Sequence, residues 1–306
     1  MVTVCVTTYN HARWVAQALE SILAQRTSFE VEVIVGDDCS TDSTVDVCRA
    51  YVERYPGRVR LLEAERNMGM RANYRRTIEA ARGEYIAMCD GDDFWCDEQK
   101  LQRQVEVLER DAEVGLCYSR SKRFHEGQND EWVYPRGVMH CDFESLLFEN
   151  TVDNVTAVAR RSLVMQYYAE VRPEEHPEWL TDDQPMWLWV AARSKVVALE
   201  RVTAAHRLLS ESQSQSRDFS RRIAFCDSLM DISMWMDDKV GTGRNIERLE
   251  RKRMEVALWV LSRDGSTREY VRRWWRDVCR SPRLLLNIAG YGLLAKRWLR
   301  KVGIIK

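Results

Sequence analysis

The sequence lacks the features that mark exported, membrane-spanning and disulfide-bonded proteins. No apolar run approaches the length of a membrane span, and an apolar stretch starts at Val2 without the basic leader of a secretory signal. The nine cysteines are scattered singly with no Cys-x-x-Cys pair, and the five histidines have no metal-ligand spacing. These absences predict a cytoplasmic protein whose cysteines are reduced, small, buried side chains.

Glycine-rich phosphate loops are also missing. The chain has neither Gly-x-Gly-x-x-Gly after its first apolar stretch nor Gly-x-x-x-x-Gly-Lys-Ser/Thr anywhere. A nucleotide must therefore be held by side chains and a metal. The net charge of −1 does not indicate a nucleic-acid partner, and an apolar content of 45% is ordinary for a globular protein.

Short apolar segments alternate with amphipathic ones over the first 90 residues. The segment after the first strand repeats Val15, Leu19 and Ile22 on one helical face. Such alternation predicts a parallel sheet with helices on both faces, in which ligands collect at the carboxyl ends of the strands. The strands are expected at residues 2–6, 31–35, 59–62 and 84–88.

An acidic turn follows the fourth of these strands. Asp90, Asp92 and Asp93 lie within four residues, and alternate side chains of a strand point the same way. Carboxylates this close repel one another unless a cation lies among them, and Mg²⁺ or Mn²⁺ bridging to substrate phosphates is a common solution. A solvated acidic turn is the alternative. Phe94 and Trp95 exclude an EF-hand loop.

The second half of the chain gives weaker signals. Pro185 suits a first helical turn, which places Asp183 near a positively polarised helix N-terminus. Residues 210–216 are either a plain polar loop or a lid. We expect a polar hairpin or excursion at residues 120–135, strands at 114–118, 151–159, 196–199 and 201–206 (the last two as a pair), and helices at 217–239, 246–262 and 267–279.

The C-terminal end is basic and amphipathic. From Arg272 onward Asp277 is the only acidic residue, and residues 282–301 combine leucines and Trp298 with arginines and lysines. Two interpretations remain open. The segment contacts an anionic membrane surface, or it packs on its own domain and leaves a solvated basic face.

Four ordered motifs carry a family resemblance. Residues 4–10 (Val-Cys-Val-Thr-Thr-Tyr-Asn), 35–42 (Val-Gly-Asp-Asp-Cys-Ser-Thr-Asp), 65–69 (Glu-Arg-Asn-Met-Gly) and 90–93 (Asp-Gly-Asp-Asp) resemble a family 2 glycosyltransferase. The resemblance is strong over residues 1–120, weaker to about 216 and absent beyond. It implies an α/β protein of the GT-A (Rossmann-like) fold, with a mostly parallel sheet flanked by helices.

The same resemblance implies a domain organisation. Residues 1–216 would form the catalytic domain, with a nucleotide-sugar half at 1–120 and an acceptor half with the lid at 121–216. Residues 217–306 would form a helical, basic C-terminal extension.

The resemblance also implies roles on the donor side. Asp38 would bond the uracil N–H, Asp90 would contact the ribose or donor sugar, and Asp92 would bind the metal. The other residues implied to surround the base and diphosphate are Thr7, Tyr9, Asn10, Asn67 and Arg71.

On the acceptor side, the family's base is an Asp just before a helix. Asp183 matches best, with Asp182 in reserve; simple helix N-terminal charges are the alternative. Family members often carry Tyr-Arg-x-His near the lid, but here Leu209 takes the His position, so a further metal ligand stays open. Arg207 remains as a diphosphate clamp. Three tryptophans offer either acceptor platforms or core packing: Trp179, Trp187 and Trp189.

The resemblance therefore predicts an inverting, hexosyltransferase-type glycosyltransferase that uses Mn²⁺ or Mg²⁺ and a nucleotide sugar, with a UDP-sugar preferred. The acceptor would be a glycan or a lipid-linked oligosaccharide in surface polysaccharide synthesis, at the inner face of the cell membrane. A sugar nucleotidyltransferase and a non-catalytic nucleotide-sugar-binding protein are the alternatives. The first would normally carry a glycine-rich, basic loop where residues 7–10 stand.

Overall fold

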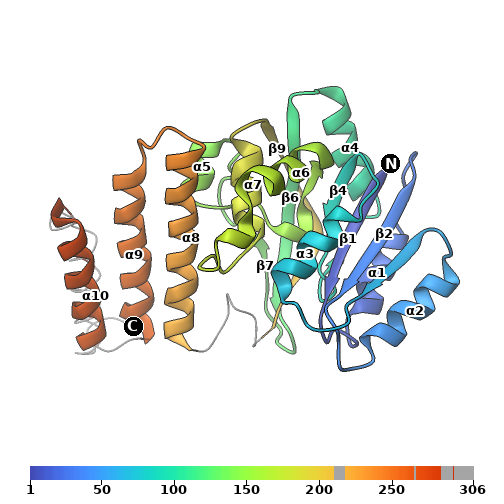
Figure 1. The fold of residues 1–306 in the computed structure, drawn as a ribbon, viewed down its shortest axis with the longest axis horizontal. Helices are drawn as coiled ribbons and strands as arrows, with labels where there is room; N and C mark the ends of the chain where they lie inside the picture. The colour runs from blue at the N-terminus through green and yellow to red at the C-terminus, as the bar shows by residue number, and fades with distance from the viewer. Residues whose placement is uncertain (210–217, 265–266, 284–291, 293–306) are drawn as a thin grey trace. The chain divides into compact units, whose positions relative to one another are not determined.

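The computed structural model describes residues 1–209, 218–264, 267–283 and Gly292 (Figure 1). The chain divides into two compact units. The first comprises Met1–Pro177 and Thr181–Leu208, and the second comprises Glu178–Leu180 and Leu209–Lys306. The expected lid at 210–216 and most of the basic stretch at 282–301 lie outside the described residues.

The first half of the first unit has the predicted alternation of strands and helices. Its strands run parallel in the order β3-β2-β1-β4. Every residue of β1 and β2 is buried, as expected for parallel strands covered on both faces. The elements are β1 (Val2–Thr8), α1 (Val15–Leu23), β2 (Val31–Asp37), α2 (Thr44–Arg54), β3 (Val59–Glu63), α3 (Met70–Glu79) and β4 (Tyr85–Met88).

The second half of this unit continues the same sheet in mixed directions. The order runs on as β4-β8-β6-β9-β5, and β6 pairs antiparallel with β8. On its other side β6 pairs in parallel with β9 (Figure 1). The predicted polar hairpin is confirmed as the antiparallel pair of β6 and β7. The elements are β5 (Phe94–Trp95), α4 (Lys100–Arg110), β6 (Val114–His125), β7 (Glu131–Tyr134), α5 (Phe143–Phe148), β8 (Val158–Arg160), α6 (Arg161–Val171), α7 (Asp183–Ala191) and β9 (Lys195–Leu208).

Two expected strand assignments are wrong. Residues 196–199 and 201–206 are not a pair but one strand, β9, because register shifts against β6 near Arg120 absorb the irregularity. Residues 151–159 are mostly not a strand. Asn154–Thr156 form a 3₁₀ turn, since both the backbone N–H and the hydroxyl of Thr156 donate to the Asp153 carbonyl, at 2.8 and 2.7 Å.

The burial of side chains decides between the two roles left open for the tryptophans and corrects the expectation for the cysteines. Trp187 and Trp189 are 1% and 0% exposed, so they pack in the core and offer no platform for an acceptor. Trp179 is also buried; it and Trp235 both belong to the second unit, and their ring centroids are 5.3 Å apart. All nine cysteines are free, but Cys96, Cys141 and Cys279 are exposed, so only part of the set behaves as small buried side chains.

The second unit contains the three predicted C-terminal helices α8 (Phe219–Lys239), α9 (Ile246–Asp264) and α10 (Thr267–Arg280). Leu258, Tyr270 and Val278 lie in its core. The buried Arg273 joins helices through bonds to Asp227 (2.7 Å) and Asp277 (2.7 Å). Within the residues described, no helix is both long enough and apolar enough to cross a membrane.

Candidate functional site

The loops that follow β1, β2 and β4 meet at one edge of the sheet, because these parallel neighbours end side by side. The Thr7 hydroxyl donates to the Asp90 carboxylate, and the Gly91 N–H donates to the Thr7 carbonyl at 2.8 Å. The Asp38 N–H donates to the Thr8 carbonyl at 3.0 Å. Candidate residues from three separate motifs therefore share one edge.

Asn10 joins the first two of these loops. It has a positive φ of 57°, a conformation that Asn tolerates better than most side chains. Its side-chain oxygen accepts from the Thr41 N–H at 2.8 Å, and its own N–H donates to the Ser40 hydroxyl at 2.9 Å. The preceding Tyr9 is left 43% exposed at this edge, where an aromatic ring can meet a ligand.

Asp38 fixes a further loop, the one between β3 and α3. Its buried carboxylate accepts from the N–H groups of Met68 (2.8 Å) and Gly69 (2.9 Å), and the Asn67 side chain accepts from Gly69 at 3.1 Å. Gly69 has a φ of 87°, which requires glycine. Carboxylate oxygens have further lone pairs, so Asp38 retains acceptor capacity for a base N–H.

Arg71 ties the start of α3 to the segment before α7. Its Nε lies 2.7 Å from Asp182 Oδ1, and its Nη1 donates to the carbonyls of Pro173 (3.1 Å) and His176 (2.8 Å). Burial raises the pKa of Asp182 to about 6, although the Arg71 cation opposes the rise. Arg71 and Asp182 therefore already serve the structure as partners.

The three carboxylates of the acidic turn have different surroundings. Asp90 bonds to Thr7, and the buried Asp93 accepts from the Arg207 N–H at 2.8 Å. Burial and the charge of Asp92 raise the pKa of Asp90, and burial raises that of Asp93 further. Among the described residues, the nearest potential partner of the Asp92 carboxylate is the His11 ring, whose Nδ1 is 4.0 Å from Oδ1. Asp92 is thus the carboxylate that is left open.

The side chain of Arg207 fixes the acidic turn in place. This side chain is only 8% exposed. Its Nε donates to the Asp92 carbonyl at 2.8 Å, and its Nη2 donates to the Gln17 side chain at 2.8 Å. Its Nη1 forms an ion pair with Glu126. The guanidinium also lies 4.9 Å from the Phe124 ring centre. Arg207 therefore positions Asp92, and its direct contact with a diphosphate stays a prediction.

Sequence reasoning missed a second charged group beside this turn. Asp153 accepts from the Ser121 hydroxyl (2.5 Å), Arg123 Nε (3.0 Å) and His206 Nδ1 (2.8 Å). Burial opposes ionisation of Asp153, but His206 and Arg123 outweigh it and lower its pKa below the ordinary range. Burial lowers the pKa of His206, but Asp153 and Asp93 outweigh this and raise it to about 9. His206 is therefore a cation at neutral pH.

Asp183 begins α7 at the same edge. Its half-buried carboxylate accepts from the Thr181 hydroxyl and from the Gln184 N–H at 2.8 Å. Burial raises its pKa, and the charge of Asp153 adds to the rise. Burial raises the pKa of Tyr74, and the charges of Asp90 and Asp183 add to the rise. Both carboxylates therefore act on the same tyrosine, although they are far apart in the sequence.

The side chains at this edge fit a divalent ion that would be bound mainly by oxygen atoms of the enzyme's substrate. No group of three His, Cys, Asp or Glu side chains in the described part of the chain could hold a metal alone. Asp92 offers an open carboxylate, and Mg²⁺ sites commonly use one or two carboxylates together with substrate phosphates. Asp92 would hold the ion, and a diphosphate would supply further oxygens.

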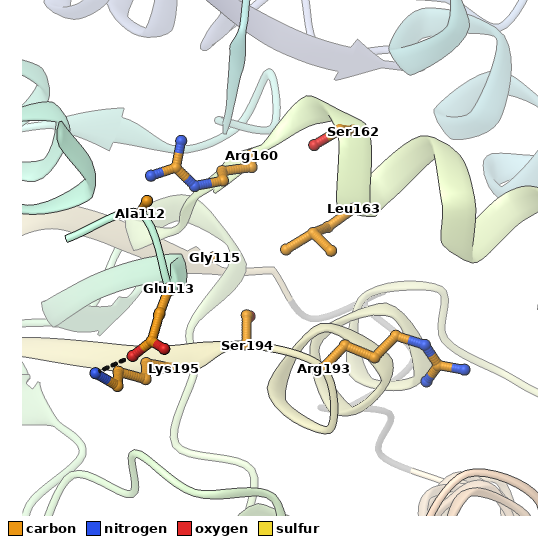
Figure 2. Close-up of a pocket in the computed structure, with 9 residues that line it drawn as sticks. All are labelled: Ala112, Glu113, Gly115, Arg160, Ser162, Leu163, Arg193, Ser194 and Lys195. Atoms are coloured by element: carbon orange, nitrogen blue, oxygen red, sulfur yellow. Dashed lines mark ion pairs between the residues drawn. The ribbon is translucent and has the colours of Figure 1, made fainter.

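A separate cavity of about 510 Å³ lies where β6 and β9 begin, at the other end of these strands (Figure 2). Glu113 and Lys195 form an ion pair at its wall, and Arg160 donates to the Val114 carbonyl at 2.9 Å. None of the candidate residues lines it. This cavity therefore adds nothing to the candidate site.

The chain resembles solved glycosyltransferase structures in fold. S. aureus TarS in complex with UDP-GlcNAc matches with a TM-score of 0.60 at 17% identity, covering 90% of this chain and 80% of that one. The mannosyltransferase PcManGT of Pyrobaculum calidifontis, in complex with GDP-Man and Mn²⁺, matches with a TM-score of 0.56 at 20% identity, covering 100% and 88%. These likenesses show the GT-A fold.

Sequence relatives match up to half of the chain. An uncharacterised protein of Mycobacterium tuberculosis is 37% identical over 155 residues, which is 50% of this chain and 45% of that protein. TuaG of Bacillus subtilis, named for teichuronic acid biosynthesis, is 33% identical over 108 residues, 35% of this chain and 42% of that protein. The chain thus spans less than half the length of these relatives. The model of glycosyl transferase family 2 matches residues 3–167, more than half of the sequence, and the chain belongs to that family.

Proposed function

We propose that the protein is an inverting glycosyltransferase that moves a sugar from a UDP-sugar to a hydroxyl group of a glycan or lipid-linked acceptor. The observation that carries this proposal is that Asp90, bonded to Thr7, lies with the donor-side loops at one edge of the sheet; in addition, after burial, the charges of Asp90 and Asp183 both raise the pKa of Tyr74. This supports a site in which Asp90 would contact the ribose or donor sugar and Asp183 would act as the base.

The donor side would hold the nucleotide through preformed loops. Tyr9 would stack on the base, Asp38 would accept from the uracil N–H, and Asn67 and Arg71 would lie beside the base and diphosphate. Their support is that Asn10, Asp38 and Asn67 already fix these loops through backbone bonds, so binding requires little ordering. Asp90, held by Thr7, would contact the ribose or the sugar.

The leaving group would be stabilised at Asp92. Asp92 would hold a divalent ion, which would supply positive charge for the departing diphosphate. Asp92 contributes an oriented carboxylate, because Arg207 holds its carbonyl and Asp93 accepts from the Arg207 N–H. Mn²⁺ and Mg²⁺ both suit such an oxygen site.

Asp183 would act as the general base. The acceptor oxygen forms a bond to the anomeric carbon, the proton of that hydroxyl moves to the Asp183 carboxylate, and UDP leaves from the opposite face. Burial raises the pKa of Asp183, which strengthens it as a base. The bonds from Thr181 and Gln184 keep the carboxylate oriented.

Support for the acceptor class comes from a relative and from the second unit, not from the candidate site. TuaG bears a name for teichuronic acid biosynthesis, which supports a polysaccharide-forming role. In the second unit, the exposed face of α10 carries Arg272, Arg276 and the 59% exposed Trp275. Cationic side chains around an exposed tryptophan suit an anionic membrane, where a lipid-linked acceptor would be found.

The membrane part is tested by co-sedimentation with phosphatidylglycerol vesicles. Charge reversal in Arg272→Glu/Arg276→Glu should reduce binding, and vesicles of phosphatidylcholine alone are the control. Equal sedimentation of the variant and the wild type would remove membrane contact through α10 from the proposal.

The donor part is tested by thermal unfolding with UDP, GDP, CMP or NAD, each with and without Mn²⁺. A ligand that binds only the folded state raises the melting temperature by mass action. We expect a rise with UDP that is larger when Mn²⁺ is present. A rise with NAD alone would contradict the proposal, and so would the absence of a rise with every nucleotide tested.

Reaction products separate the proposal from its alternatives. Incubation with UDP-sugars and candidate acceptors should release UDP and form a product of inverted anomeric configuration. Release of pyrophosphate would indicate a nucleotidyltransferase, and binding without turnover would indicate a non-catalytic binder.

A further inference from the structure

Two buried polar atoms beside Asp92 have no hydrogen-bond partner among the residues that the structure describes. They are the hydroxyl oxygen of Thr8, a residue 2% exposed, and Nδ1 of His11. A polar atom that is removed from water without a partner destabilises the fold. Such atoms are expected where a ligand completes the bonding.

Both atoms face the backbone of Gly91. A Cβ atom placed on Gly91 would lie 2.9 Å from His11 Nδ1 and 2.9 Å from the Thr8 hydroxyl oxygen. The glycine therefore leaves a small space that two unpartnered polar atoms line. Any side chain at position 91 would fill it.

Asp92 borders this space from the next residue. Its Oδ1 is 4.0 Å from His11 Nδ1, too far for a hydrogen bond. Two ligands bound at about 2.1 Å to one octahedral ion lie about 3.0 Å apart when adjacent and about 4.2 Å apart when opposite. The observed separation falls between these values, so one ion could reach both atoms.

The chain keeps His11 in this position. It lies in the loop after β1, and Asp92 lies in the turn after β4, the neighbouring strand. The His11 ring packs edge-on against Trp14, with centroids 5.9 Å apart. The Gly91 N–H, bonded to the Thr7 carbonyl, fixes the acidic turn against the end of β1.

We propose that His11 is a second protein ligand, through Nδ1, of the divalent ion held by Asp92, and that the Thr8 hydroxyl bonds a water on that ion. This inference rests on the proposed function, because the ion is that of the nucleotide-sugar donor. It gives the site a histidine although Leu209 stands where family members often carry one. Imidazole binds transition metals better than it binds Mg²⁺, so His11 should favour Mn²⁺ over Mg²⁺.

The test is pulsed electron paramagnetic resonance of Mn²⁺ bound in the presence of UDP. An imidazole ligand produces nitrogen modulation of the electron spin echo. We expect this modulation in the wild type, its loss in His11→Gln, and its retention in His206→Gln, which changes the nearby histidine bound to Asp153.

Binding measurements supply a second readout. By calorimetry, His11→Gln should weaken Mn²⁺ binding to the UDP complex about tenfold or more and reduce the preference for Mn²⁺ over Mg²⁺. UDP binding without metal should be unchanged. Thr8→Val should weaken Mn²⁺ binding less than His11→Gln does.

Each outcome decides the inference. Mn²⁺–UDP binding without nitrogen modulation in the wild type would overturn the role of His11 and leave the proposed function standing. Modulation lost in His206→Gln instead would assign the ligand to His206 and overturn the inference. Failure of the wild type to bind Mn²⁺ with UDP at all would overturn both the proposed function and this inference.

Discussion

Two groups of polar side chains at the same edge of the sheet differ in whether their hydrogen bonds are completed within the protein. Around Asp153, the side chains of Ser121, Arg123 and His206 all donate to one buried carboxylate. Around Gly91, the Thr8 hydroxyl and His11 Nδ1 lack partners in the described structure, and Asp92 is 4.0 Å from His11.

The difference indicates which side chains stabilise the fold and which are available to bind a ligand. A satisfied network stabilises the fold, and its members have pKa values shifted toward their charged forms, as for Asp153 and His206. An unsatisfied group costs stability unless a ligand completes it. Substitutions in the first group should therefore lower stability, and those in the second should lower binding.

The largest expected effect lies at Asp183, which belongs to neither group. Asp183→Asn keeps the shape but removes the base, so turnover should fall about 10²–10⁴-fold. UDP affinity should stay near the wild-type value, because the donor-side loops are unchanged. Steady-state kinetics and calorimetry on one preparation measure both quantities, and normal turnover would show that another group accepts the proton.

The pH profile of turnover gives a matching expectation. Burial and Asp153 raise the pKa of Asp183, and the base must be deprotonated to act. Turnover should therefore rise with pH through a midpoint above the ordinary carboxyl value of 3.8. In Asp183→Asn the residual rate should lose this rise; an unchanged profile would contradict the assignment.

Asp153→Asn should give the largest loss of stability. It leaves Arg123 and the His206 imidazolium without their anion, and breaking such a buried pair costs about 3 kcal/mol. Urea unfolding measures the loss. A loss as small as that of an exposed ion pair would mean that this network does not support the site.

The same network predicts how stability depends on pH. The folded pKa of His206, about 9, exceeds its unfolded value of 6.5, so its contribution is complete below about 6.5 and is lost as pH rises through 9. The folded pKa of Asp153 is depressed, so its contribution is present above 3.8 and is lost as pH falls. The difference in unfolding free energy between wild type and Asp153→Asn should narrow as pH rises through 9, where His206 loses its charge, and again as pH falls below 3.8, while the pair of Asp153 with Arg123 keeps part of it at high pH.

The smallest expected effect on stability is that of Thr8→Val. The substitution keeps the branched shape and removes a buried hydroxyl that has no partner among the described residues, so the unfolding free energy should be unchanged or slightly higher. Ser121→Ala is the matched control, because the Ser121 hydroxyl is bonded to Asp153 and its loss should destabilise. A larger loss for Thr8→Val than for Ser121→Ala would reverse the comparison.

Local sequence signals predicted the first half of the fold and one edge of the site. Alternating apolar segments and the turn at Asp90 are properties of neighbouring residues, and the structure confirms the strands that they indicate. The Asp153 network was not predictable in this way, since its partners are 30, 32 and 53 residues away and meet only when β6 and β9 pair.

His11 shows a second limit. It follows Asn10 directly, yet no local pattern shows that its Nδ1 lacks a partner, because this depends on a glycine contributed by the turn after β4. Likewise, the tryptophans of α7 looked suitable for stacking, but their burial depends on how the whole helix packs.

The most direct test compares Asp92→Asn with the wild type by urea unfolding without ligand and by UDP binding with and without Mn²⁺. Burial raises the pKa values of Asp90 and Asp93, and the charge of Asp92 adds to the rise, so removing that charge should not destabilise the ligand-free protein, and Asp92 should be needed only for binding. We predict that Asp92→Asn is at least as stable as the wild type and loses the Mn²⁺-dependent part of UDP binding. A variant that unfolds as readily as Asp153→Asn, or that keeps Mn²⁺-dependent UDP binding, would contradict the account.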